Sequence, residues 1–268
     1  MVATKFHNKI PQTIHFSLKH TVLHLQSTEI CLEGEINSNY LLIDQKGKRY
    51  IWRVPKDNEH IHTIIQEDLE QTKFLQTGGT YRYRNIGEQV QFMNHALAAN
   101  LNVPNPIYHN TQGLLLPYIE AVPFDKVLQK GNSDSIIPAL QHLHQAHIQS
   151  IVFGDRWVKN TLVTQENKIF EVDFDLEITG PHAAEFEIAQ TLYHILLFTK
   201  DKQKIERILL KHFAQSDLQS AYDMKYVRLF LKGFADHFGT GIYEGIQGGT
   251  KEESYRLLQS FQRLDKTT

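Results

Sequence analysis

One stretch, residues 153–175, limits the folds open to this chain more than any other part of the sequence. It contains two short apolar runs, 161–163 and 168–172, that have the composition of β-strands. A reversal at Asn167-Lys168 separates the two runs, so we expect them to pair as a hairpin. Such a hairpin decides which of the flanking polar residues come close together.

Three polar residues flank this hairpin. Asp155 and Asn160 precede the first strand, and Asp173 follows the second, so the hairpin is expected to bring Asn160 and Asp173 near each other. An aspartate can accept a proton from an attacking hydroxyl, while an amide oxygen and a carboxylate can hold Mg²⁺ against nucleotide phosphates. Gly154 permits a close approach of the backbone just before Asp155. Asp and Asn also favour ordinary turns, so the prediction of a phosphoryl-transfer site rests on the order of these residues.

Composition narrows the class of protein. The chain has 268 residues, of which 41% are hydrophobic and 22% charged, as in ordinary globular proteins. A net charge of -2 argues against a general nucleic-acid binder. The single cysteine, Cys31, excludes an intramolecular disulfide and a cysteine-rich zinc site. No apolar run approaches the ~18 residues of a membrane span, and no signal peptide is apparent, so we expect a cytoplasmic protein.

The order of the expected elements, strands first and helices later, predicts an α+β fold. Residues 57–84 have the pattern of an insertion with one helix over 60–76. The basic-aromatic run 81–84 within it could touch a nucleic acid or a phosphate, but a surface loop is the favoured interpretation. The strands expected elsewhere are 29–34, 40–44, 48–54, 107–109 and 113–117. The first three are expected to form an antiparallel meander, with Gln45-Lys46-Gly47 as the turn between the second and the third. The helices expected elsewhere are 85–100, 133–150, 182–199, 202–214, 216–238 and 251–264. Residues 118–123 read as a linker.

In this order the landmarks resemble the aminoglycoside phosphotransferase and choline kinase family, over about residues 28–260. Phe153-Gly154-Asp155 with Asn160 resembles the family's catalytic loop. The run 172–175 resembles its metal-binding segment, and 186–189 resembles the start of the helix that follows. The resemblance implies that Asp155 is the catalytic base.

The resemblance also implies a two-lobed, protein-kinase-like fold. Residues 1–118 would form an N-terminal nucleotide-binding lobe, with an antiparallel sheet, one main helix and the helical insertion 57–84. Residues 119–268 would form a helical catalytic and acceptor-binding lobe. The implied activity is transfer of the γ-phosphate of ATP, with Mg²⁺, to a hydroxyl of a small molecule such as an amino sugar or a choline-like amine; GTP is not excluded. Asn160 and Asp173 would bind Mg²⁺, with Asp175 as a carboxylate beside them.

The nucleotide site that the resemblance implies centres on Arg53. It stands on the strand that carries a cation for the phosphates, and a permanently charged guanidinium can fork onto phosphate oxygens. Glu88 stands where the family has the carboxylate partner of that cation. The other nucleotide-binding residues implied are Gly34, Asn37, Asn39 and Glu120.

The acceptor cannot be read from the sequence. Trp157, Asp223 and Tyr226 are candidates for its pocket, because aromatic and acidic residues suit a cationic acceptor. Core packing explains the helical spacing of the late aromatic residues more simply. Phe153 stands where the family often has histidine, and no Ala-Pro-Glu element follows. The missing element counts against an ordinary protein kinase, whereas Phe153 supports a nucleotide-binding pseudokinase. Both a minimal protein kinase or effector that modifies a protein and a pseudokinase remain as alternatives, and the oligomeric state is open.

Overall fold

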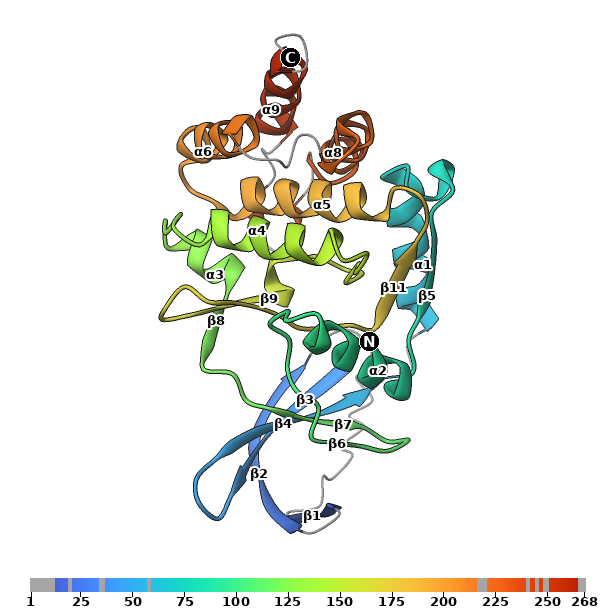
Figure 1. The fold of residues 1–268 in the computed structure, drawn as a ribbon, viewed down its shortest axis with the longest axis vertical. Coiled ribbons are helices and arrows are strands. Elements are labelled where there is room, and N and C mark those ends of the chain that lie inside the picture. Colours follow the sequence, from blue (N-terminus) through green and yellow to red (C-terminus); the bar gives the residue numbers. More distant parts are fainter. Residues whose placement is uncertain are drawn as a thin grey trace, which may run out of the picture. The chain divides into compact units, whose positions relative to one another are not determined.

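The computed structural model divides by its internal contacts into two compact units (Figure 1). The first comprises Met1–Ile61 and Asn105–Ile119, and the second comprises His62–Pro104 and Glu120–Thr268. The residues that the structure describes are 13–18, 21–33, 37–56, 59–215, 221–239, 242–243, 246–247 and 251–264.

The first unit is built on a six-stranded antiparallel sheet with the strand order β1-β2-β3-β4-β7-β6. The strands are β1 (Thr13–Leu18), β2 (Thr21–Glu33), β3 (Asn37–Asp44), β4 (Arg49–Pro55), β6 (Tyr108–His109) and β7 (Leu114–Pro117). Buried side chains from four of the strands form its core, namely Leu25, Leu42, Tyr50, Trp52 and Leu115. The antiparallel meander predicted from the sequence is confirmed.

The turn between β3 and β4 shows how local chemistry sets this meander. The Asp44 carboxylate accepts hydrogen bonds from the backbone N–H groups of Lys46 and Lys48, each at 2.8 Å. Gly47 lies in the left-handed region with φ 79°, which a residue without a Cβ adopts at little cost. The turn therefore fixes the register in which β3 and β4 pair.

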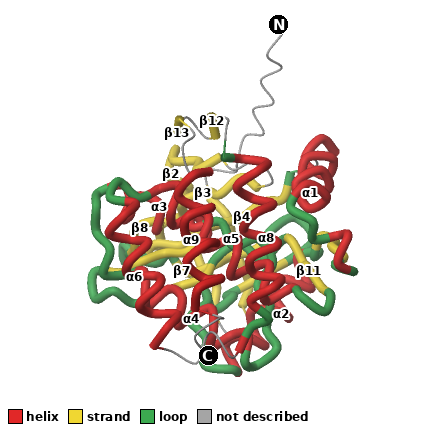
Figure 2. Tube along the Cα trace, turned by 90° about the horizontal axis from the view of Figure 1, so that it is seen from above, coloured by secondary structure: helices red, strands yellow, loops and turns green. Residues whose placement is uncertain are grey.

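The second unit is mainly helical. Its helices are α1 (Glu59–Gln71, whose first turn belongs to the first unit), α2 (Ile86–Ala98), α3 (Phe124–Gln129), α4 (Ile136–His147), α5 (Ala183–Phe198), α6 (Lys202–Gln215), α8 (Met224–Phe238) and α9 (Lys251–Leu264). Every residue of α5 from Phe186 to Phe198 is buried, so other elements surround this part of the helix on all sides. Figure 2 shows α8 beside α5, against which it packs.

Three small sheets complete the second unit. Strands β8 (Ala121–Pro123), β9 (Thr161–Thr164) and β10 (Ile169–Glu171) form one sheet, β5 (Thr80–Tyr83) and β11 (Leu176–Thr179) the next, and β12 (Ile242–Tyr243) and β13 (Ile246–Gln247) the last. The β9–β10 pair is the predicted hairpin, in antiparallel register with Ile169 opposite Val163. Asn167 makes the reversal with φ 59°, a conformation that asparagine tolerates. The α+β class is likewise confirmed, with the sheet early in the chain and helices dominating its C-terminal part.

The prediction of a surface loop at 81–84 is wrong. Residues Thr80–Tyr83 form β5, which pairs in antiparallel register with β11, and Arg84 is only 7% exposed. The pairing partner lies about a hundred residues later, so no local pattern indicates it. The predicted helix in this insertion is confirmed, but α1 ends at Gln71 because Lys73 takes a left-handed φ of 73°.

Two further boundaries differ from the expectation. The linker at 118–123 contains β8 and runs directly into α3. The helix expected at 216–238 begins at Met224, where the side chain of Asp223 accepts a hydrogen bond from Lys225 N and caps α8. Residues 216–220 lie outside the described residues.

Some expectations are not tested by the fold. The lobe limits 1–118 and 119–268 stay a prediction; by internal contacts, residues 62–104 go with the second unit. Among the helices that the structure describes, none has the length and apolar character to cross a membrane. The cytoplasmic location stays a prediction.

Candidate active site

The loop before the β9–β10 hairpin depends on a glycine. Gly154 has φ 115°, and a Cβ added there would lie 1.9 Å from the backbone oxygen of Leu176. The Gly154 N–H also donates a hydrogen bond to Oε1 of the buried Glu187 on α5. The loop is therefore held between β11 and α5, and this fixes the position of the next residue, Asp155.

Asp155 is oriented by Gln190, a buried residue of α5. Gln190 Oε1 accepts a hydrogen bond from Arg156 N at 2.8 Å. Because this fixes the oxygen of the amide, Nε2 faces Asp155 and donates to its Oδ1 at 2.9 Å. The other carboxylate oxygen, Oδ2, remains available to accept a proton.

The pKa of Asp155 is raised from its usual range to about 7. Burial is the main cause, and the nearby charge of Asp173 adds to it. The charges of Arg156 and Lys159 and the hydrogen bond from Gln190 act in the opposite direction. A carboxylate with a pKa near 7 is well matched to general-base catalysis at neutral pH.

Asn160 and Asp173 lie next to this carboxylate. Asn160 ends a short 3-10 turn, Val158–Asn160, and its Nδ2 donates to the backbone oxygen of Asp155 at 3.1 Å. Its backbone oxygen accepts from Val172 N at 2.9 Å, and Val172 directly precedes Asp173. The hairpin therefore brings Asn160 close to Asp173, as predicted from the sequence, and Asn160 is in turn hydrogen-bonded to Asp155.

The donor set suits Mg²⁺. With Asn160 Nδ2 donating to the backbone, Asn160 Oδ1 is the oxygen directed to other partners, and Asp173 contributes a carboxylate. Both are hard oxygen donors, and Mg²⁺ is commonly held by one or two side chains together with water and substrate phosphates. Within the described ranges no three His, Cys, Asp or Glu side chains gather as a metal cage.

Two buried arginines, which the sequence did not single out as site residues, hold this loop in place. Arg156 is 2% exposed; its Nη1 donates to Glu171 Oε2 at 2.7 Å and its Nη2 donates to the backbone oxygen of Asp173 at 2.8 Å. A charged residue directly after Asp155, and a glutamate inside an apolar strand, were the signals available in the sequence.

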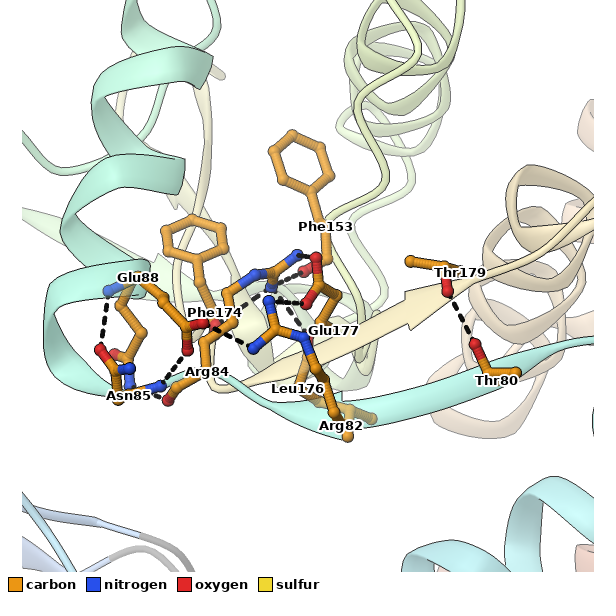
Figure 3. Close-up of polar contacts among 11 residues, drawn as sticks. Thr80, Arg82, Arg84, Asn85, Glu88, Phe153, Phe174, Leu176, Glu177 and Thr179 are labelled. Carbon is orange, nitrogen blue, oxygen red and sulfur yellow. Dashed lines mark hydrogen bonds and ion pairs between the residues drawn. The ribbon is translucent and has the colours of Figure 1, made fainter.

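Arg84 is the second of these arginines (Figure 3). Its Nη1 donates to three backbone oxygens, those of Phe153 at 3.4 Å, Phe174 at 3.2 Å and Leu176 at 2.9 Å. Its guanidinium also lies 4.1 Å from the ring centroid of Phe92 on α2. One side chain thus connects the loop that precedes Asp155, the segment after Asp173 and β11.

Glu88 has partners within the second unit. Its Oε1 accepts from Arg82 Nη1 at 2.7 Å, and its Oε2 accepts from the N–H of Asn85, which caps α2 (Figure 3). Arg82 Nη2 also contacts Glu177 Oε2 at 2.5 Å. Arg53 belongs to the first unit, so its pairing with Glu88 stays a prediction.

The remaining nucleotide-binding candidates are distributed over both units. Arg53 on β4 is buried and lies directly opposite Asn39 on β3. Asn37 is two positions from Asn39 and therefore points to the same face of the sheet. Glu120 is exposed and is the first residue of the segment Glu120–Thr268 of the second unit. Gly34 lies outside the described residues.

A cavity of about 50 Å³ lies beside Asp155, and Trp157 is among its lining residues. Asp223 and Tyr226 do not line it: Asp223 caps α8, and Tyr226 stacks on His182 at 3.3 Å between ring centroids. Asp175 is buried, and its backbone oxygen accepts from Arg84 N at 2.7 Å.

No family model and no curated protein matches this sequence. Among solved structures, the Rio2 kinase of Chaetomium thermophilum in its ADP/Mg²⁺-phosphoaspartate complex matches with 12% identity, 90% of this chain, 72% of that chain and a TM-score of 0.44. Another structure of that kinase matches with 9% identity, covers 96% of this chain and 84% of that chain, and has a TM-score of 0.43. An ethanolamine kinase of Plasmodium vivax matches with 9% identity, covers 90% of this chain and 82% of that chain, and has a TM-score of 0.48. All three are kinases, but at such identities and TM-scores the likeness says nothing about substrate or activity.

Proposed function

We propose that this protein is an ATP- and Mg²⁺-dependent phosphotransferase that acts on a hydroxyl group of a small molecule. The observation that carries the proposal is the state of Asp155. One oxygen of its carboxylate is held by Gln190, its pKa is about 7, and it lies beside the charge of Asp173. This combination of a positioned base and an adjacent oxygen-rich metal-binding pair is what phosphoryl transfer requires.

Asp155 Oδ2 accepts the proton of the acceptor hydroxyl as the hydroxyl oxygen bonds to the γ-phosphorus. The bond between the γ-phosphorus and the oxygen bridging to the β-phosphate breaks, and ADP leaves with that electron pair. Asn160 and Asp173 would hold Mg²⁺, which neutralises charge on the phosphate oxygens. Arg53, which belongs to the first unit, would bind phosphate oxygens of the nucleotide.

Thermal-shift titration with Mg²⁺ and ATP or GTP tests the nucleotide half of the proposal. Ligand at 100 times its Kd stabilises the folded state by about 2.7 kcal/mol, so the midpoint should rise only when Mg²⁺ and nucleotide are both present. The rise should disappear in Asp173→Ala and shrink in Arg53→Ala. It should persist in Asp155→Asn, because Asp155 acts on the acceptor.

Transfer assays test the catalytic half. Asp155→Asn should lose turnover by about 10²-fold or more while still binding nucleotide. Full activity in this variant would exclude Asp155 as the base. Binding of nucleotide without transfer to any hydroxyl would favour a pseudokinase, and label incorporated into protein would indicate a protein acceptor.

A further inference from the structure

The cavity beside Asp155 has one wall that belongs to the segment predicted as an insertion. Ile65, Asp68 and Leu69 of α1 line the cavity, together with Thr72 directly after that helix. The other walls come from the catalytic loop, β11, α5 and α8. A group that enters the cavity would therefore contact α1 and the carboxylate of Asp155 at the same time.

The α1 wall is fixed to α8. Gly233 of α8 lies so close to Thr72 that an added Cβ would be 2.7 Å from the Thr72 backbone oxygen. Asp68 Oδ1 and His237 Nε2 of α8 are 2.8 Å apart and share a hydrogen bond. Side-chain size on α1 is therefore expected to set the size of the cavity, because the helix backbone is tied to its neighbour at two points.

The lining is mostly apolar, and its polar groups other than Oδ2 of Asp155 already have partners. Thr72 Oγ1 donates to the backbone oxygen of Asp68 at 2.7 Å, Asp68 is paired with His237, and Gln190 is held by Asp155 and Arg156. The apolar lining side chains include Ile65, Leu69, Trp157, Phe186, Phe234 and Phe238. A guest with several hydroxyl or ammonium groups would bury them without partners, which is unfavourable.

Resting on the proposed function, we infer that the acceptor is a small neutral alcohol with one hydroxyl and an apolar body, and that Ile65 and Leu69 set its size. The hydroxyl faces Asp155, and the carbon chain packs against the aromatic and aliphatic walls. A cavity of 50 Å³ accommodates roughly three to five groups of water size, since one water needs about 10–15 Å³ on the same measure. A short primary alcohol fills this space.

Three acceptors of nearly the same size test the chemistry of the cavity. Propan-1-ol is neutral, ethanolamine replaces its terminal methyl group by an ammonium group, and glycerol adds two hydroxyls to the same three carbons. With ATP and Mg²⁺, kcat/KM for propan-1-ol should exceed that for the other two by about tenfold or more. Equal or better use of ethanolamine or glycerol would overturn the neutral apolar acceptor and leave the phosphotransferase proposal intact.

A pair of adjacent isoleucines tests the α1 wall. Ile65→Ala removes a lining side chain and should raise kcat/KM for pentan-1-ol about tenfold relative to propan-1-ol. Ile64→Ala makes the same change at a neighbouring side chain that is 40% exposed and absent from the lining, so it should leave the preference unchanged. Identical alcohol preferences in Ile65→Ala and wild type would refute the role of α1.

Binding without nucleotide separates this inference from the proposed function. The chain has two tryptophans, so a Trp52→Phe variant carries Trp157 alone as a fluorescent reporter at the cavity. Its emission should respond saturably to propan-1-ol, with a weaker response to ethanolamine. A response without any nucleotide-induced thermal shift would support the cavity inference and remove the phosphotransferase proposal. No saturable response to propan-1-ol, together with no transfer to it, would overturn the inference.

Discussion

Gln190 Nε2 lies 2.9 Å from Asp155 Oδ1, and the direction of this hydrogen bond is fixed because Gln190 Oε1 is bound to Arg156 N at 2.8 Å. An amide with its oxygen committed to a backbone donor can present only its NH₂ group to the carboxylate. Gln190 thus stabilises the ionised form of Asp155 and leaves Oδ2 for the proton acceptance that we propose. We regard it as a positioning residue that acts through Asp155.

Replacing Gln190 by Glu should move the acid limb of the pH–kcat profile to higher pH. The new carboxylate would face Asp155 Oδ1, and two like charges at that distance raise the pKa of the pair. We expect a shift of about one unit or more and a fall in kcat at pH 7 of about tenfold, with recovery at higher pH. KM for the nucleotide should change little.

Gln141→Glu is the matched control for this prediction. It makes the same chemical change on α4 at an exposed position, so its pH profile should follow that of the wild type. Coincident profiles for Gln190→Glu and the wild type would show that Gln190 does not act on the carboxylate of Asp155.

Asp155→Asn should stabilise the fold at neutral pH while removing activity. The folded-state pKa of about 7 lies above the usual 3.8, so the ionised carboxylate disfavours the folded state. That cost is absent below about pH 4, develops between pH 4 and 7, and is complete above pH 7. One pKa unit is worth about 1.4 kcal/mol, so the shift corresponds to at most about 4 kcal/mol.

The measurement is the free energy of unfolding of both proteins from pH 4 to 8 with EDTA present, so that no divalent ion binds the neighbouring oxygens. The variant should match the wild type at pH 4 and exceed it increasingly up to pH 7. A difference that is constant over this range would mean that the pKa of Asp155 is not raised.

The parts of the fold that the sequence predicts are those defined by local patterns. The β9–β10 hairpin follows from two apolar runs around Asn167, and the β3–β4 turn follows from Gln45-Lys46-Gly47, because both are decided by residues next to each other. The approach of Asn160 and Asp173 follows from the hairpin in the same way. Here the neighbouring residues contain all the information that the structure uses.

The parts that the sequence does not predict depend on partners far away in the chain. β5 pairs with β11, whose residues come about a hundred positions later, so the run 81–84 has no local sign of being a strand. Arg84 reads as a surface cation because a single arginine gives no indication that three buried backbone oxygens will accept its hydrogen bonds. The position of α1 beside Asp155 likewise comes from tertiary packing.

Arg84→Met should destabilise the second unit strongly. It removes the donor shared by the backbone oxygens of Phe153, Phe174 and Leu176 and leaves these acceptors buried without it. We expect a loss of about 3–5 kcal/mol. Arg82→Met changes a side chain that is 54% exposed, and its ion pairs are expected to contribute about 1 kcal/mol or less.

Urea unfolding of both variants measures these losses in stability. The m-values are compared to establish that unfolding still exposes the same amount of surface. Arg82→Met is the control for loss of one positive charge from the same strand segment. Equal midpoints for the two variants would contradict the role assigned to Arg84.

Gly154→Ala should be far more damaging than the same substitution at Gly47, although both glycines have positive φ. At Gly47, with φ 79°, nothing lies within 4 Å of an added Cβ, so only the left-handed backbone is penalised, by about 1–2 kcal/mol. At Gly154, with φ 115°, the Cβ would lie 1.9 Å from the Leu176 backbone oxygen, and the loop must move. We expect a loss of about 4 kcal/mol or more there.

Because Asp155 follows directly, any folded Gly154→Ala protein should also lose turnover, whereas Gly47→Ala should keep it. Melting temperatures and transfer rates of the two variants test this prediction. Similar values for both would show that the close approach to Leu176 does not constrain the loop that carries Asp155.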